Sequence, residues 1–221
     1  MKIWFLRDPL TDNCSCYIEE MTVRLKLTRV QLALIGALLL LLITAVPLIG
    51  IPLRWYVPPY PAFGKQVAWN LGYPEAAYNF DAVVPGRLYR SALPDARFIQ
   101  YVHRVYGVQH IVSLVGPIPA HDTARKLGIK VTVFYWLYGY LPPPQELNAV
   151  LDLTNGQTPL LIHCNAGRDR TGYAVAAYRL LRQKWHLDQA VNEMKRYWHK
   201  PESKSRIQQF LQQAAQLSDK S

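Results

Sequence analysis

The sequence predicts an α/β domain with a mainly parallel central sheet flanked by helices, preceded by one transmembrane helix. Two observations carry this prediction. Short apolar, β-branched runs alternate with helical patterns from residue 79 onward, as is typical of parallel strands joined by helical crossovers. A separate stretch, residues 30–53, contains no charged residue. With 221 residues, the chain has room for one domain of ordinary size plus extensions.

The uncharged stretch is long enough to cross a hydrocarbon core of about 30 Å as a helix. Gln31 and Thr44 are its only clearly polar residues. Buried helices of soluble proteins are rarely this long, and the apolar part of a cleaved signal peptide is only about 7–15 residues. We therefore expect a single-pass membrane anchor at 30–53, after an N-terminal tail of residues 1–29.

Basic residues are concentrated on the N-terminal side of the expected anchor, where Arg24, Lys26 and Arg29 lie close to it. The C-terminal side offers only Arg54 and Lys65 before the pattern of a folded domain begins. Under the positive-inside rule, this asymmetry predicts a cytoplasmic N-terminus and a domain on the non-cytoplasmic side of the membrane.

Residues 54–78 are rich in proline and aromatic residues, and this composition predicts a semi-extended linker. The folded domain is expected at 79–221. Its strands are expected at 87–91, 109–115, 129–136 and 159–163. Its helices are expected at 94–106, 121–127, 143–154, 171–183, 187–199 and 202–217.

The most informative segment follows the last expected strand and reads His163, Cys164, Asn165, Ala166, Gly167, Arg168, Asp169, Arg170 and Thr171. Successive backbone N–H groups at the start of a helix form an anion-binding concavity, and their positive field stabilises a thiolate. The guanidinium of Arg170 offers planar, bidentate donors to phosphate oxygens, and Gly167 lets the backbone turn sharply. The segment therefore predicts phosphate-ester chemistry through the thiolate of Cys164.

The order His-Cys, five residues, Arg-Thr resembles the signature of the cysteine-dependent protein tyrosine and dual-specificity phosphatases. A second stretch, residues 79–94, contains Leu88-Tyr89-Arg90-Ser91 and resembles the opening of the bacterial and fungal atypical dual-specificity phosphatases. The two resemblances cover about residues 79–200 and imply the cysteine-phosphatase fold. The alternative is a buried cysteine at a strand end with an arginine nearby by chance.

The resemblance implies a role for each loop residue. Cys164 would be the nucleophile and form a phosphocysteine. The phosphate would be bound by the Arg170 side chain and by the loop amides of Asn165, Ala166, Gly167, Arg168, Asp169 and Arg170. His163 would support the loop and tune the thiolate. Thr171 would either donate a hydrogen bond to the leaving sulfur or satisfy backbone groups where the helix starts.

The sequence departs from the family pattern at the position of the general acid. The resembled enzymes usually take the leaving-group proton from an aspartate after the preceding strand, but residues 137–145 contain no carboxylate here. Asp169 is the first candidate, as in a branch of phosphatases whose loop ends in Lys-Asp-Arg-Thr, several of which act on phosphoinositides. Asp122 and water are the other candidates. Asp169 has a second interpretation, in which it only forms an ion pair with Arg168 or Arg170.

Residues 54–221 carry 20 lysines and arginines against 11 aspartates and glutamates, a net charge of +9. Such a surface favours anionic partners, and next to an anchor an anionic bilayer is the simplest one. We find no nucleic-acid motif, and the anchor argues against a nucleic-acid partner. We expect neither a metal nor a cofactor. The sequence leaves the oligomeric state open.

The expected function is that of a membrane-anchored phosphatase that hydrolyses phosphomonoesters through a phosphocysteine, with phospholipid or phosphoinositide headgroups as substrates. One alternative is a protein tyrosine or dual-specificity phosphatase. Another is a phosphatase-like module that binds phosphate without turnover. The intact pair of Cys164 and Arg170 favours an enzyme, while the missing carboxylate at 137–145 keeps the binding module open.

Overall fold

The computed structural model describes residues 28–51, 53, 57–137, 140, 142–198 and 209. The contacts divide the chain into two units, residues 1–44 and 45–221. The N-terminal tail up to residue 27 and nearly all of the helix expected at 202–217 lie outside the described residues.

The expected anchor is a single helix, α1 (Arg29–Gly50), which ends three residues earlier than the uncharged stretch. Thr28 and Gln31 form a capping box at its start. The Gln31 side chain accepts from the Thr28 N–H at 2.9 Å, and the Thr28 hydroxyl accepts from the Gln31 N–H at 3.2 Å. Its mean hydropathy is 2.8, so by length and composition the helix is able to cross a membrane. A signal sequence near the N-terminus passes the same test.

Residues 45–221 are built on a five-stranded mixed sheet with the order β1-β2-β5-β3-β4. The strands are β1 (Asp81–Val84), β2 (Leu88–Ser91), β3 (His110–Ser113), β4 (Lys130–Val133) and β5 (Leu160–His163). The four expected strands are present and pair in parallel, while β1 pairs antiparallel with β2. The sequence reasoning missed β1, a short edge strand that returns through a turn in which Gly86 has a φ of +75°.

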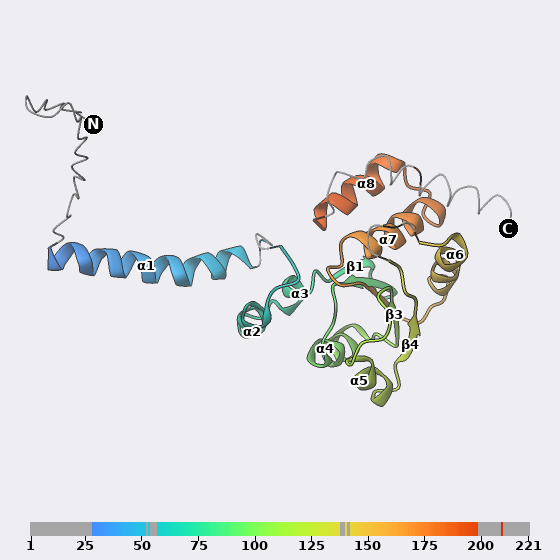
Figure 1. The fold of residues 1–221 in the computed structure, drawn as a ribbon, viewed down its shortest axis with the longest axis horizontal. Coiled ribbons are helices and arrows are strands. Elements are labelled where there is room, and N and C mark those ends of the chain that lie inside the picture. Colours follow the sequence, from blue (N-terminus) through green and yellow to red (C-terminus); the bar gives the residue numbers. More distant parts are fainter. Residues whose placement is uncertain are drawn as a thin grey trace, which may run out of the picture. The chain divides into compact units, whose positions relative to one another are not determined.

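Helices cover both faces of the sheet (Figure 1). On one face lie α4 (Ala96–Tyr106) and α5 (His121–Lys126), and on the other lie α6 (Pro144–Leu153), α7 (Asp169–Leu181) and α8 (Leu187–Arg196). Local signals fix α4: the Asp95 side chain accepts from the Phe98 N–H at 2.9 Å, and Gly107 ends the helix in the left-handed conformation. The structure is therefore a three-layer α/β/α domain.

The segment 54–78 differs from the semi-extended linker that its composition predicts. It contains α2 (Ala62–Asn70) and α3 (Pro74–Ala77). Pro74 occupies the first position of a helix, where proline is tolerated because its missing N–H has no partner to lose. Tyr60, Ala68 and Tyr78 are buried in the core on the α4 side of the sheet. The folded part of the chain therefore extends back to Tyr60, well before residue 79.

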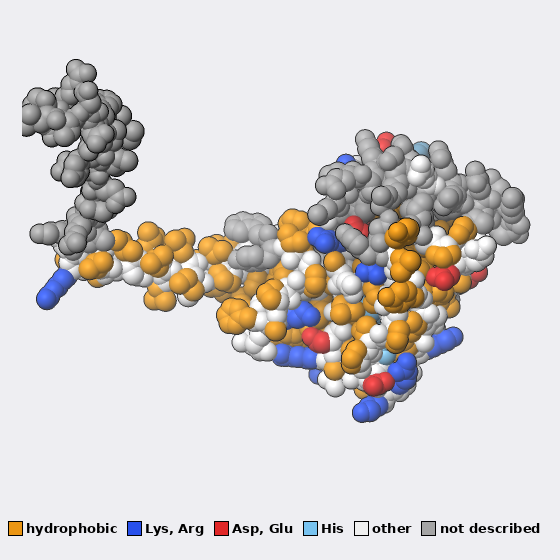
Figure 2. Space-filling view, in the orientation of Figure 1, with side chains coloured by type: hydrophobic (Ala, Val, Ile, Leu, Met, Phe, Trp, Pro, Cys, Tyr) orange, Lys and Arg blue, Asp and Glu red, His pale blue; other side chains and the backbone are white. Residues whose placement is uncertain are grey.

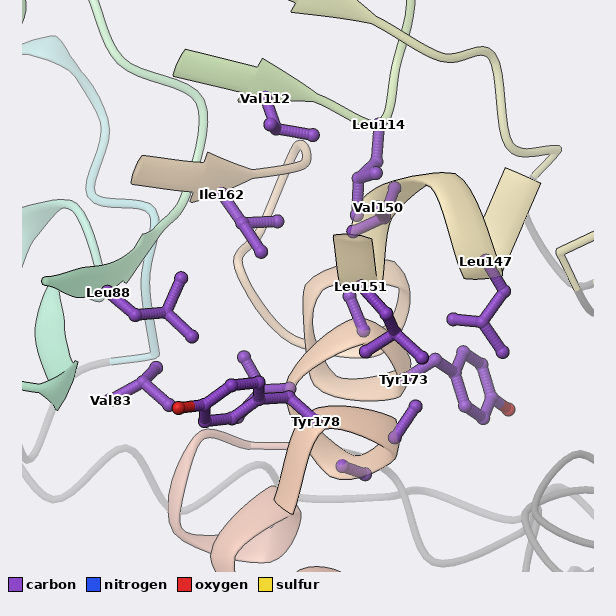
Figure 3. Packing of buried hydrophobic residues seen from close by; sticks show 14 of the residues in the cluster. Val83, Leu88, Val112, Leu114, Leu147, Val150, Leu151, Ile162, Tyr173 and Tyr178 are labelled. Carbon is purple, nitrogen blue, oxygen red and sulfur yellow. The ribbon is translucent and has the colours of Figure 1, made fainter. Parts of the chain in front are cut away.

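The core is divided by the sheet because side chains alternate along each strand. Leu88, Val112 and Ile162 face α6 and α7, where they pack with Val150 and Leu151 (Figure 3). We call this side the α7 face. Tyr89, Ile111 and Leu161 point the other way and pack against α4, and we call that side the α4 face.

Candidate active site

The predicted catalytic loop lies between the end of β5 at His163 and the start of α7 at Asp169. It is at the carboxyl edge of the parallel strands, where α/β sheets place their ligands. Cys164 is only 2% exposed and belongs to the core of the α7 face. A pocket above it is lined by Cys164, Asn165, Ala166, Arg168, Asp169 and Arg170. The structure therefore brings the predicted phosphate-binding residues, except Gly167, together around the thiol.

Gly167 lies behind the pocket and has a φ of +65°. A Cβ atom at this position would lie 2.7 Å from both the backbone N of Ala92 and the carbonyl carbon of Ser91. Glycine is therefore required twice, for the left-handed backbone and for the close approach of the loop to the end of β2.

Arg170 is in the first turn of α7, and its Nη1 donates to the carbonyl of Trp136 at 3.0 Å. This hydrogen bond ties the guanidinium to the connection between β4 and α6. Arg170 thus lines the pocket while its guanidinium is held by this connection.

Two residues that the sequence reasoning did not assign to the site hold the loop from behind. The Arg90 Nη2 donates to the Gly167 carbonyl at 2.7 Å. The Asn79 Nδ2 donates to the carbonyls of Ala166 and Gly167 at 3.2 and 3.3 Å. Both residues belong to the second stretch that resembles the phosphatases. The sequence feature that could have indicated a role for Arg90 is an arginine inside a strand that is expected to be buried.

His163 is fully buried beneath the loop, and its ring faces α5. Burial lowers the pKa of His163 to about 3, aided by the neighbouring His121 and opposed by the backbone at Cys164. The Nε2 atoms of His163 and His121 are 3.5 Å apart. His163 is therefore a neutral support below Cys164, while the carbonyls further along the loop are held by Asn79 and Arg90.

Thr171 is fully buried, and its hydroxyl has no hydrogen-bond partner within the described part of the chain. The start of α7 has no side-chain capping hydrogen bond. The capping interpretation of Thr171 is therefore not supported, and its hydroxyl is left as a donor next to the catalytic loop.

The two candidate acids are placed differently. Asp169 lines the pocket together with Cys164 and Arg170. Asp122 is in α5, where its carboxylate pairs with Arg125 at 2.8 Å and its side chain is 75% exposed. Geometry therefore favours Asp169 over Asp122 as the proton donor.

The connection between β4 and α6, whose Trp136 carbonyl accepts from Arg170, carries exposed apolar side chains. Tyr135 and Tyr140 are each 69% exposed, and Leu137 is 56% exposed. Figure 2 shows hydrophobic side chains gathered over this part of the domain surface. Since Trp136 contacts Arg170, we call Tyr135, Leu137 and Tyr140 the apolar rim of the site.

Comparison with known proteins agrees with the fold and the loop. A model of the tyrosine phosphatase family matches residues 143–219, which include the catalytic loop. The inositol diphosphatase SIW14 of Saccharomyces cerevisiae is 29% identical over 143 residues, which are 61% of this chain and 50% of that protein. The dual specificity protein phosphatase TpbA of Pseudomonas aeruginosa is 31% identical over 114 residues, 49% of this chain and 50% of that protein. The chain thus spans about half the length of these curated relatives.

A solved structure agrees with the same fold. The core catalytic domain of the PP-IP phosphatase SIW14 from Saccharomyces cerevisiae, crystallised with citrate, superposes with a TM-score of 0.54 and 28% identity. The match covers 61% of this chain and 84% of that one. The fold and the loop together are those of a phosphatase-type α/β domain whose catalytic loop is built around a cysteine. These findings point to the superfamily of cysteine-dependent tyrosine and dual-specificity phosphatases.

Proposed function

We propose that this chain hydrolyses phosphomonoesters through a phosphocysteine intermediate. The observation that carries the proposal is the pocket lined by Cys164, Asp169 and Arg170 at the N-terminus of α7. A thiolate nucleophile, a guanidinium and a set of loop amides in one pocket can bind a phosphoryl group and transfer it.

The first step forms a bond between the Cys164 sulfur and phosphorus and breaks the bond between phosphorus and the ester oxygen. Asp169, protonated at this stage, gives its proton to the leaving oxygen. In the second step Asp169 takes a proton from water, which attacks phosphorus and displaces the thiolate. Inorganic phosphate leaves, and Thr171 donates a hydrogen bond to the departing sulfur. The loop amides and Arg170 stabilise the charge on the equatorial oxygens in both steps.

The substrate proposed for this site is a phosphorylated group at a membrane surface, and a lipid headgroup in particular. Three features support it: the apolar helix α1, the net charge of +9 on residues 54–221, and the apolar rim beside the pocket. Tyrosines and aliphatic residues favour the interfacial zone of a bilayer, while basic residues are attracted to anionic lipids. Arg168 adds a second cation to the pocket, which suits a headgroup with more than one negative charge.

The test uses the full chain reconstituted in vesicles. Hydrolysis of a phosphatidylinositol phosphate in anionic vesicles should be faster than hydrolysis of a phosphotyrosine peptide, and it should fall with added salt. Leu137→Ser should slow the lipid reaction and leave a soluble aryl phosphate unaffected. A clear preference for peptides, insensitive to vesicles and salt, would support a protein phosphatase instead, as the identity with TpbA suggests. Absence of turnover on every phosphomonoester would leave only the binding module.

The proposed location is a single-pass membrane protein with its N-terminus in the cytoplasm and its phosphatase domain on the other side. The apolar character of α1 and the basic residues that precede it support this topology. A reporter that is active only in the cytoplasm, fused after Ser221, should give no signal. A strong signal would reverse the topology and leave the phosphatase proposal intact.

A further inference from the structure

We propose that Arg90 and Asn79 are positioning residues that orient the phosphate-binding amides of the catalytic loop, and that Arg90 supplies a further positive charge beneath the site, in addition to Arg168 and Arg170. The inference rests on the proposed function, since it assigns these residues to the same reaction. Neither side chain lines the pocket, so both act from behind the loop.

The guanidinium of Arg90 has a fixed place in the core. Arg90 is wholly buried near the carboxyl end of β2. Its guanidinium stacks 3.6 Å from the ring centroid of Tyr197, the residue that follows α8. The Tyr197 hydroxyl in turn donates to Asp81 in β1 at 2.8 Å. Arg90 is therefore held by the sheet and by the end of α8 before it contacts the loop.

Because of peptide geometry, these contacts also orient the backbone N–H groups of the loop. A trans peptide points its N–H and its C=O in opposite directions. Arg90 and Asn79 hold the carbonyls of Ala166 and Gly167 on the sheet side of the loop. The N–H groups of the same two peptides, on Gly167 and Arg168, are therefore turned to the opposite side, where the neighbouring residues line the pocket.

The charge of Arg90 acts on the same loop. Burial lowers the pKa of Arg90, and electrostatic interactions with Tyr197, Glu193, Cys164 and Asp81 oppose this effect. A buried cation behind the loop favours a phosphate bound on the other side of it. The Nε and Nη1 of Arg90 have no hydrogen-bond partner among the residues that the structure describes. A buried guanidinium with unused donors destabilises a core, and an apolar side chain would pack there at lower cost.

The chain contains a matched control for this arginine. Arg87 also donates to a backbone carbonyl, that of Thr154 at 3.2 Å. It precedes β2, whereas Arg90 lies near the end of that strand beside the loop. Removing Arg87 therefore deletes the same kind of hydrogen bond at the end of the strand away from the site.

The test compares Arg90→Met, Arg90→Lys, Asn79→Ala and Arg87→Met in full-length protein with Cys14 and Cys16 replaced by serine. Turnover of an aryl phosphate gives kcat and KM, and protection of Cys164 from iodoacetamide gives the Kd of inorganic phosphate. Arg90→Met should lower kcat/KM by about 10²-fold, the size of losing one oxyanion donor, and raise the phosphate Kd by about tenfold. Asn79→Ala should cause a smaller change of the same kind, Arg90→Lys should recover part of the loss, and Arg87→Met should change neither quantity.

A purely structural role would have a different signature. It would lower the melting temperature and the folded fraction, but kcat, KM and the phosphate Kd per folded molecule would match the unchanged protein. That result for Arg90→Met and Asn79→Ala would overturn the inference, as would an equal loss in Arg87→Met. If Arg90→Met does not fold, Arg90→Lys and Asn79→Ala decide the question. The phosphate Kd needs no turnover, so failure of the proposed function would be seen separately.

Discussion

The two faces of the sheet are packed with different kinds of side chain, and only one of them carries the site. The α7 face is filled largely by small and aliphatic residues, among them Ala174, Ala176 and Ala177 of α7. A Cβ atom on Gly172 would come within 3.2 Å of Met194, so α7 and α8 approach closely. The α4 face is aromatic: the rings of Tyr78 and Phe98 stack with centroids 3.9 Å apart.

This difference indicates a division of labour. Small side chains let α7 lie close to the sheet, and the catalytic loop is the short connection between β5 and α7. The aromatic side chains of the α4 face bury large apolar areas against the sheet and stabilise it. Substitutions on the α7 side near the loop should therefore change rates, and substitutions on the α4 face should change stability.

The largest effect is expected at Cys164, the proposed nucleophile. Cys164→Ser should reduce turnover to background, because a serine hydroxyl at this position lacks the nucleophilicity of a thiolate. Binding of inorganic phosphate, measured by calorimetry, and the melting temperature should persist. Hydrolysis well above background in this variant would show that the α7 face does not hold the nucleophile.

The next effect concerns Asp169, the proposed proton donor at the start of α7. Asp169→Asn should slow hydrolysis of an alkyl phosphate by about 10²–10⁴-fold, the usual range for general acid catalysis. An aryl phosphate with a good leaving group should be slowed much less. Equal losses on both substrates would indicate an ion pair or a loop defect. A loss seen only in Asp122→Asn would move the role to α5.

On the α4 face, Phe98→Ala should destabilise the domain by about 3–5 kcal/mol, as deletion of a fully buried aromatic ring does. The loss should appear in chemical unfolding of the full chain in detergent, with KM for an aryl phosphate unchanged at temperatures where the protein is folded. Val105→Ala, at a half-exposed position of the same helix, is the control and should have little effect. A large rise in KM for Phe98→Ala would mean that the two faces are not independent.

The smallest effect is expected at His163, where the two faces meet. Its ring faces His121 of α5, whereas the next residue, Cys164, packs on the α7 face. The pKa of His163 is lowered to about 3 in the fold, so between about pH 6.5 and pH 3 the unfolded chain binds a proton that the folded chain does not. The free energy of unfolding should therefore fall as the pH drops through this range. The contribution is at most about 1.4 kcal/mol per pH unit.

His163→Gln should flatten this pH dependence in urea unfolding between pH 7.5 and 4.5. His121→Gln is the informative companion variant, because burial also lowers the pKa of His121 and the two rings face each other. An unchanged slope in His163→Gln would show that carboxylates alone set the acid sensitivity of the domain.

The prediction from sequence was most successful where the signal is local. The parallel strands β2 to β5 were expected because their apolar runs are contiguous, and the loop was expected because its functional residues follow one another. The same reasoning failed for residues 54–78, where proline content suggested an extended chain. It could not show that the aromatic rings of that segment pack on α4, because their partners lie elsewhere in the sequence.

The sequence by itself determined the strand, the loop and the helix that follows, and it predicted the nucleophile and the phosphate-binding residues, because these depend on residues within one strand–loop–helix unit. Tertiary structure alone decided what holds that loop. Arg90 and Asn79 reach Gly167 across 77 and 88 positions of the chain, and the Trp136 carbonyl meets Arg170 across 34. Such contacts follow from strand order and from which side of the sheet each residue faces. The spacing of residues within the loop determines neither the strand order nor the facing of these residues.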